Sequence, residues 1–215
     1  MSIYQSIYKG LGQGKSIFYA WFEMMHTRVD LVFCHGEETK LRSIVTDMAE
    51  ELLRLENLVN RFNRGSELSR LNNKAFSCPV KVSEELFSMI QYCIDSCYKT
   101  FGYFDITVNS KNGYRDGIKN IILDDYYSTV QFLHPDIKLD LCGYIKGYAL
   151  DRMKKLIQNK VSDALLSLGN SSVMALGNHP YGKGWKIAIN AQNYPYMMPK
   201  SIVLHNECFT SSGNS

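Results

Sequence analysis

The apolar positions of the first sixty residues change from strand spacing to helix spacing. Val29, Leu31 and Phe33 mark one face of a predicted strand over 28–34, and 17–25 is predicted as the strand before it. Residues 38–62 then carry the longest helical pattern, in which apolar residues recur at intervals of three and four. This pattern predicts a long amphipathic helix packed on a sheet. Gly65 is predicted to end this helix, and Ser66 to cap a short turn that follows it.

A second helix is predicted after Ser83, which is followed by Glu84 and Glu85 near the positive end of the helix. Gly102 is predicted as its C′ residue, and 103–108 as a strand that contains one carboxylate, Asp105. A buried acid needs partners, so Asp105 is either hydrogen-bonded to nearby N–H groups or part of a site.

The second half of the chain is richer in short apolar runs separated by Gly, Asn and Pro. The predicted strands are 128–133, 136–141, 164–168, 173–176, 185–190 and 201–204. Long helices alternate with these strand clusters, few of them in βαβ order. The fold class expected is α+β, with antiparallel or mixed sheets packed against long amphipathic helices, in a single domain over 1–215.

The stretch from Asp140 to Asp151 is the richest in candidate chemistry. It joins a predicted strand over 137–141 to a helical pattern, so Gly143 and Gly147 are placed in or beside a strand-to-helix turn. The free N–H groups at a helix start favour a phosphate, Lys146 adds a positive charge, and Asp140 offers an acceptor or helps to seat a cation. An ordinary glycine-containing turn remains the alternative.

Residues 10–16 resemble a phosphate-binding P-loop only superficially. The first glycine of G-x-x-x-x-G-K-S would have to be residue 9, which is Lys9, and the residues that follow are aromatic and strand-like. We therefore expect a flexible glycine-rich entry and no ATPase.

Composition and charge argue against several classes of protein. The net charge of +3 and the absence of a Lys/Arg cluster argue against nucleic acid. No run of about 18 apolar residues exists, which argues against a membrane span. The six cysteines form no C-x-x-C pair or zinc spacing, so reduced thiols and a cytoplasmic location are expected from the chain as written.

Taken in order, several motifs resemble the flavin transferase family, the ApbE-type FAD:protein FMN transferases formerly called thiamine biosynthesis lipoproteins. The resemblance covers about residue 20 to 215. Its motifs are a turn at 25–27, the segments 60–62 and 66–72, GYFDITV at 102–108, DLCGYIKGYALD at 140–151, a glycine loop at 169–177 and SSG at 211–213.

The resemblance implies transfer of FMN from FAD to a Ser or Thr hydroxyl of an acceptor protein, with AMP released and Mg²⁺ required. It implies Asp140 and Lys146 as the catalytic residues, and the Gly143 carbonyl as a metal ligand. The FAD-binding residues that it implies are Met25, Phe62, Tyr103, Phe104, Asp105, Asp140 and Lys146.

The chain departs from the family pattern at several positions. His26 and Cys142 replace glycines, Phe62 replaces a tyrosine, and Asn170 with Ser171 departs from a Gly-Gly loop. The sequence also stops before the family's HIIDPxTG segment and the later Asp and Thr of its magnesium site. It is therefore either a truncated transferase or a short relative, for which weak or no transfer is expected. The alternatives are an FAD-binding protein without transfer activity and a domain that has lost the ligand. Export of a longer precursor, as is frequent in the family, stays open.

Overall fold

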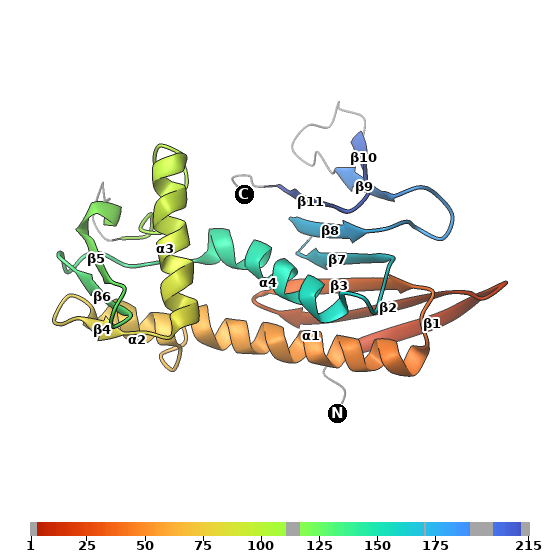
Figure 1. Ribbon diagram of the computed structural model, residues 1–215, viewed down its shortest axis with the longest axis horizontal. Helices are drawn as coiled ribbons and strands as arrows, with labels where there is room; N and C mark the ends of the chain where they lie inside the picture. The colour runs from red at the N-terminus through yellow and green to blue at the C-terminus, as the bar shows by residue number, and fades with distance from the viewer. Residues whose placement is uncertain (1–3, 111–116, 170, 190–199, 212–215) are drawn as a thin grey trace. The chain divides into compact units, whose positions relative to one another are not determined.

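The computed structural model describes residues 4–110, 117–169, 171–189 and 200–211 (Figure 1). The chain forms two compact units, the first from Met1–Leu53 and Lys146–Ser215 and the second from Arg54–Ile145. Two long helices, α1 (Glu38–Val59) and α4 (Cys142–Ile157), contribute residues to both units. The α+β class is confirmed, and every strand pairing among the described residues is antiparallel.

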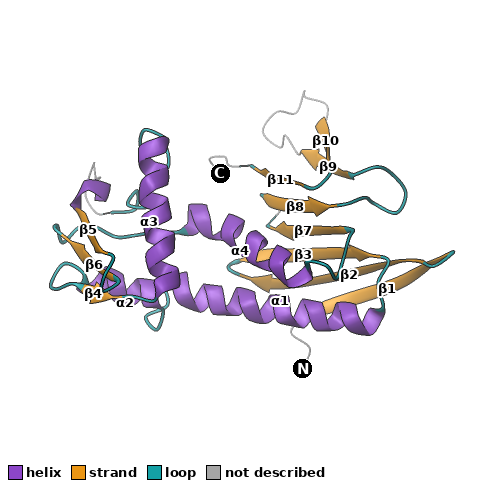
Figure 2. Ribbon diagram, viewed as in Figure 1, coloured by secondary structure: helices purple, strands orange, loops and turns teal. Residues whose placement is uncertain are grey.

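The first unit contains a six-stranded sheet in the order β1-β2-β3-β7-β8-β11 (Figure 2). Its strands are β1 (Gln5–Gly12), β2 (Lys15–Met24), β3 (Thr27–Cys34), β7 (Ala164–Leu168), β8 (Ser172–Leu176) and β11 (Glu207–Thr210). The strands predicted over 17–25, 28–34, 164–168 and 173–176 are confirmed to within about two residues.

Apolar residues are buried on both faces of the central part of this sheet. Leu31 and Phe33 of β3 are fully buried, and the Arg42 guanidinium of α1 lies 5.5 Å from the ring of the buried Phe18. On the other face a second cluster joins Cys34 to Trp185 and further residues of a two-stranded sheet, β9 (Trp185–Ile189) and β10 (Lys200–Leu204).

The glycine-rich segment predicted as a flexible entry is instead the tip of a hairpin. Gly12 of β1 pairs with Lys15 of β2, and the two residues between them, Gln13 and Gly14, have φ of 51° and 73°. Two consecutive residues with positive φ are typical of the turn that suits the twist of paired strands. The segment therefore connects strand to strand, which agrees with the rejection of a P-loop.

The second unit contains α2 (Glu67–Lys74), α3 (Glu84–Lys99) and a small sheet in the order β4-β6-β5. Its strands are β4 (Val80–Lys81), β5 (Ile121–Asp124) and β6 (Thr129–Phe132), with a short 3-10 helix, Gly117–Asn120, before β5. The two predicted N-caps are confirmed. The Ser66 hydroxyl accepts from the N–H of Ser69, and the Ser83 hydroxyl accepts from the N–H of Leu86.

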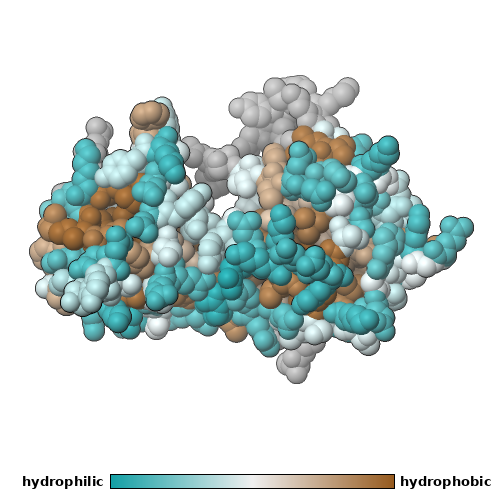
Figure 3. Space-filling view, viewed as in Figure 1, coloured by the Kyte–Doolittle hydropathy of each residue, from teal (hydrophilic) through white to brown (hydrophobic). Residues whose placement is uncertain are grey.

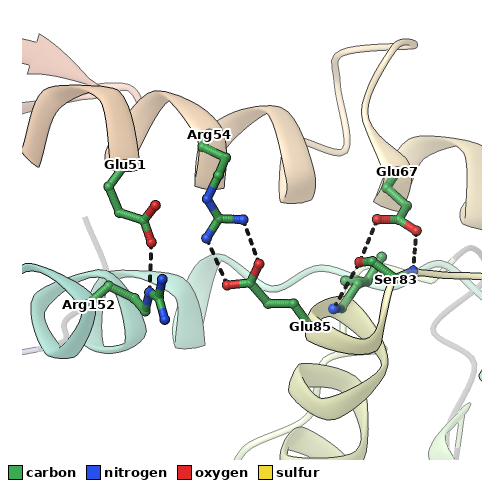
Figure 4. Close-up of polar contacts among 7 residues, drawn as sticks. Glu51, Arg54, Glu67, Ser83, Glu85 and Arg152 are labelled. Carbon is green, nitrogen blue, oxygen red and sulfur yellow. Dashed lines mark hydrogen bonds and ion pairs between the residues drawn. The ribbon is translucent and has the colours of Figure 1, made fainter. Parts of the chain in front are cut away.

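Carboxylates hold the start of α3 in place (Figure 4). The Glu67 carboxylate accepts from the backbone N–H of Ser83 at 2.5 Å and from its hydroxyl at 2.8 Å. Glu85 accepts two hydrogen bonds from the Arg54 guanidinium, at 2.5 and 2.9 Å. These contacts fix the N-terminus of α3 within the second unit. In the first unit, Figure 4 also shows Arg152 of α4 paired with Glu51 of α1 at 2.7 Å.

Two predicted helix ends are wrong by a few residues. Helix α1 ends at Val59, not at Gly65, since the Asn60 side chain accepts from the N–H groups of Phe62 and Asn63. Helix α3 has Thr100 as its C-cap, so Phe101, with φ of 53°, occupies the C′ position that was predicted for Gly102. Phe101 N–H donates to Tyr98 and Gly102 N–H to Cys97, which is the Schellman pattern.

Two predicted strands, 103–108 and 136–141, are not strands in the structure. Residues 103–108 form turns, and 136–141 contains no strand. The second segment is nevertheless held by side chains. Asn72 donates to the carbonyl of Leu139 and accepts from its N–H, and the N–H of Asp140 donates to Ile106 at 2.7 Å. These bonds replace a strand ladder for buried backbone groups.

Hydrophobic residues on the face shown in Figure 3 gather in patches among hydrophilic ones. Among the described residues, none of the helices has the length and hydropathy that crossing a bilayer requires.

Candidate functional site

The predicted site residues fall into two groups, one in each unit, and each group is described by itself. Met25 and Lys146 belong to the first unit. The others belong to the second unit: Phe62, Tyr103, Phe104, Asp105, Asp140 and Gly143.

Asp140 is the centre of a polar cluster in the second unit. It is 9% exposed, and its Oδ2 accepts from the side-chain amide of Asn109 at 2.6 Å. Its Oδ1 accepts from the N–H of Cys142 at 2.8 Å, and Arg61 Nε lies 3.1 Å from Oδ2. Both carboxylate oxygens are therefore engaged by the chain itself.

These partners decide the charge of Asp140. Burial raises its pKa, but the hydrogen bonds from Cys142, the positive charge of Arg61 and the hydrogen bond from Asn109 together outweigh burial. The pKa of Asp140 therefore lies below its usual value, and the carboxylate is ionised at neutral pH.

Arg61 lies between this carboxylate and an exposed aromatic ring. Its guanidinium carbon is 4.4 Å from the ring centroid of Phe62, which is 72% exposed. Arg61 Nε is buried and close to Asp140 without the alignment of a hydrogen bond, so the contact is an ion pair. The sequence analysis missed both Arg61 and Asn109. The signal for Arg61 was a basic residue directly before the aromatic position of a motif.

The aromatic residues of the 102–108 motif differ in exposure. Tyr103 is 96% exposed, whereas Phe104 is half-buried, with its ring 3.5 Å from where a side chain at Gly143 would begin. Asp105 Oδ1 accepts from both the N–H and the hydroxyl of Thr107 at 2.7 Å. Of the two readings left open for Asp105, local hydrogen bonding is the one that the structure supplies.

Helix α4 begins at Cys142, so Gly143 lies in its first turn as expected, and both it and Gly147 are exposed. Gly147 lies inside the helix and not in the turn, which corrects the prediction for that residue.

In the first unit, Lys146 lies near the β7–β8 turn, which itself approaches the β2–β3 turn. Its Nζ donates to the Ser171 hydroxyl at 3.4 Å, and a Cβ added at Gly169 would lie 3.4 Å from the same nitrogen. That Cβ would also lie 2.1 Å from the Thr27 hydroxyl oxygen, and Gly169 has φ of +67°. Only glycine therefore allows the β7–β8 turn to approach the β2–β3 turn this closely.

The β2–β3 turn contains the predicted flavin contact. Met25 and His26 have φ of 55° and 56°, which makes a two-residue hairpin turn with both central residues in the left-handed region. His26 adopts there a conformation that glycine would adopt without strain. Asn170, Ser212 and Gly213, the remaining residues of the loop and SSG motifs, lie outside the described residues.

A divalent cation such as Mg²⁺ needs several oxygen ligands close together. Within 4–110, 117–169, 171–189 and 200–211, no three His, Cys, Asp or Glu side chains lie close enough to share a metal ion. The carboxylate beside Gly143, that of Asp140, is already held by Arg61, Asn109 and Cys142. This part of the chain therefore does not by itself provide an oxygen ligand set of the kind that Mg²⁺ favours.

Comparison with known proteins gives relatives of one kind. An FAD:protein FMN transferase of Chlamydia muridarum is 28% identical over 183 residues, which are 74% of this chain and 55% of that protein. Another of that name, from Chlamydia trachomatis, is 24% identical over 216 residues, which are 90% of this chain and 60% of that protein. The chain thus spans less than two thirds of the length of these relatives.

Solved structures show the same fold at low identity. The flavin transferase ApbE of Vibrio cholerae has a TM-score of 0.79 and 18% identity, over 98% of this chain and 72% of that one. The ApbE protein of Thermotoga maritima has a TM-score of 0.74 and 20% identity, over 95% of this chain and 69% of that one. The ApbE family model matches residues 25–215. A match over this much of the chain identifies the protein as a member of the ApbE family.

Proposed function

We propose that this chain is part of a flavin transferase that moves FMN from FAD to a Ser or Thr hydroxyl of an acceptor protein. The observation that carries the proposal is the family match over residues 25–215, with relatives named FAD:protein FMN transferase. Since the chain spans about 55–60% of those relatives, the activity is proposed for the protein that contains it.

The reaction is a phosphoryl-type substitution. The acceptor hydroxyl oxygen bonds to the FMN-side phosphorus and loses its proton, while the P–O bond to the AMP-side phosphate breaks and AMP leaves. Such chemistry depends on positioning and on neutralising charge. The proposal gives Lys146 a phosphate contact, and Met25, Phe62, Tyr103 and Phe104 contacts with the rings.

The roles of the two acids follow from their partners. Asp140 is ionised and paired, so it orders the start of α4 by accepting from Cys142 and orders the chain around Arg61. Asp105 orders its own turn through Thr107. Both acids are therefore proposed to shape the FAD site.

Dependence on Mg²⁺, with the Gly143 carbonyl as one ligand, is also part of the proposal. No step is assigned to the cation, because the described residues do not form its ligand set. The expected result is that a chelator abolishes AMP release and that added Mg²⁺ restores it.

The direct test mixes the purified protein with FAD and Mg²⁺, with and without a hydroxyl-bearing acceptor, and follows AMP by chromatography. AMP release with a flavin phosphoester on the acceptor, found by mass spectrometry, is the expected result. Absence of FAD binding would refute the proposal.

A second function, FAD binding without transfer, is favoured by one observation. Both oxygens of Asp140 are engaged within the chain, so this carboxylate is not free to hold a cation. FAD retained for hours with no AMP would select this function.

A further inference from the structure

We propose that Arg61 is a phosphate-binding residue of the FAD site, and that Asp140 is a positioning residue that holds it. This inference rests on the proposed function and deepens it, since it names which side chain of the second unit recognises the anionic part of the substrate.

Arg61 is held in place by contacts with Asp140 and Phe62. Its Nε lies 3.1 Å from the Asp140 carboxylate, and its guanidinium carbon lies over the Phe62 ring, 4.4 Å from the ring centroid. Asp140 is itself held by Asn109 and Cys142, so the anchor does not move freely. A long side chain held at two points keeps little rotamer freedom to lose when a ligand binds.

The terminal NH₂ groups of Arg61 remain available to a ligand. No described residue accepts a hydrogen bond from its two terminal NH₂ groups, and 27% of the side chain is exposed. A guanidinium presents N–H donors in a planar fork, which matches the oxygens of a phosphate better than an ammonium does. The neighbouring Phe62 ring offers a surface on which a flat heterocycle stacks. A charged fork beside an exposed ring is complementary to a nucleotide.

Asp140 is the residue that positions Arg61. Its oxygens already accept from Asn109 and Cys142 and form an ion pair with Arg61, and its lowered pKa keeps it ionised. An ionised carboxylate repels a phosphate, so Asp140 acts through Arg61 and not by touching the substrate's anionic group.

The test compares three probes: FAD and ADP, which carry a pyrophosphate, and riboflavin, which has no phosphate. Affinities are measured by calorimetry for the wild type, Arg61→Gln and Arg61→Lys, with Arg64→Gln as the matched control. Arg64 lies in the same loop, is exposed and forms no hydrogen bond or ion pair with described residues, so its replacement by Gln changes the net charge equally.

We expect Arg61→Gln to weaken FAD and ADP about tenfold or more, the loss typical of one charge-assisted hydrogen bond, and to leave riboflavin unchanged. Arg61→Lys keeps the charge without the fork and should bind FAD and ADP measurably more weakly than the wild type. Arg64→Gln should match the wild type. Conversely, Phe62→Leu should weaken riboflavin more than ADP.

An equal loss of riboflavin and ADP affinity in Arg61→Gln overturns the assignment, because Arg61 would then act only by supporting Phe62. Unchanged affinity for all three probes also overturns it. If Arg61→Gln does not fold, Arg61→Lys decides, and ADP affinity equal to the wild type refutes the role of the fork. If the wild-type protein binds no FAD, the proposed function itself is wrong. If the wild type binds FAD and Arg61→Gln binds FAD and ADP with the same affinity, only this inference is wrong.

Discussion

Replacing Gly169 by alanine tests the close approach of the two turns in the first unit. The new Cβ would lie 2.1 Å from the Thr27 hydroxyl oxygen and 3.2 Å from its Cβ, at a φ of +67°. The left-handed conformation costs a residue with a Cβ about 1–2 kcal/mol, and the overlap adds about 1–3 kcal/mol. We therefore expect a loss of roughly 2–5 kcal/mol, a large share of a typical stability of about 5–15 kcal/mol.

Urea unfolding followed by tryptophan fluorescence measures the loss of unfolding free energy in the first unit. The chain has two tryptophans, Trp21 and Trp185, and both belong to the first unit. With a slope of about 2 kcal/mol per molar urea, the midpoint should fall by about 1–2.5 M.

A control variant and a double mutant separate the backbone strain from the overlap with Thr27. Gly182→Ala meets nothing within 4 Å, so its effect should stay within about 0.5 kcal/mol. In a Thr27→Ala background the hydroxyl is gone, and Gly169→Ala should then retain mainly its backbone cost. If Gly169→Ala is as stable as Gly182→Ala, or if the cycle shows no coupling with Thr27, the steric reasoning is wrong.

Further predictions concern three side chains. Asp140→Asn should reduce the loss of stability in acid. The pKa of Asp140 is lowered in the folded state, so the carboxylate stabilises the fold above its unfolded-state pKa, and this stabilisation is lost as pH falls through its folded-state pKa. Urea midpoints of both proteins at pH 7 and below pH 4 will show the difference. Ser83→Ala removes the N-cap of α3 and one Glu67 contact, and should cost about 1–2 kcal/mol by circular dichroism, while an unchanged midpoint would contradict the cap. Lys146→Ala should weaken FAD binding in calorimetry with little change in melting temperature, whereas an aggregated variant would indicate a structural role.

The sequence predicted well those elements whose signal is local. Ser66 and Ser83 each precede a helix, and a hydroxyl there satisfies free N–H groups whatever the rest of the chain does. The strand over 164–168 is predicted at its observed bounds, because it is a short apolar run between turn residues.

One error arises where a distant partner decides the conformation, and two arise from local glycine preferences. The segment 136–141 has strand-like alternation, but its backbone groups bond to the side chain of Asn72, 67 positions from Leu139. The Phe101 error has a local origin: glycine is preferred at C′, but the helix ends one residue earlier than that preference indicates. The first strand was missed because the glycines of this segment suggested flexibility, whereas Gly12 ends the strand and Gly14 lies in a hairpin turn.

The Asp140 prediction shows why a motif position alone does not establish a role. The sequence identifies an acid before a helix, and an acid there serves equally as a ligand contact or as a support. The structure shows that its oxygens are taken by Arg61, Asn109 and Cys142. Loss of FAD binding in Asp140→Ala would therefore follow from either role, since an unpaired Arg61 also changes position. Only the comparison of Arg61→Gln with Asp140→Asn separates them: a positioning acid predicts the larger loss of ADP affinity for Arg61→Gln, and the reverse order would make Asp140 the group that touches the substrate.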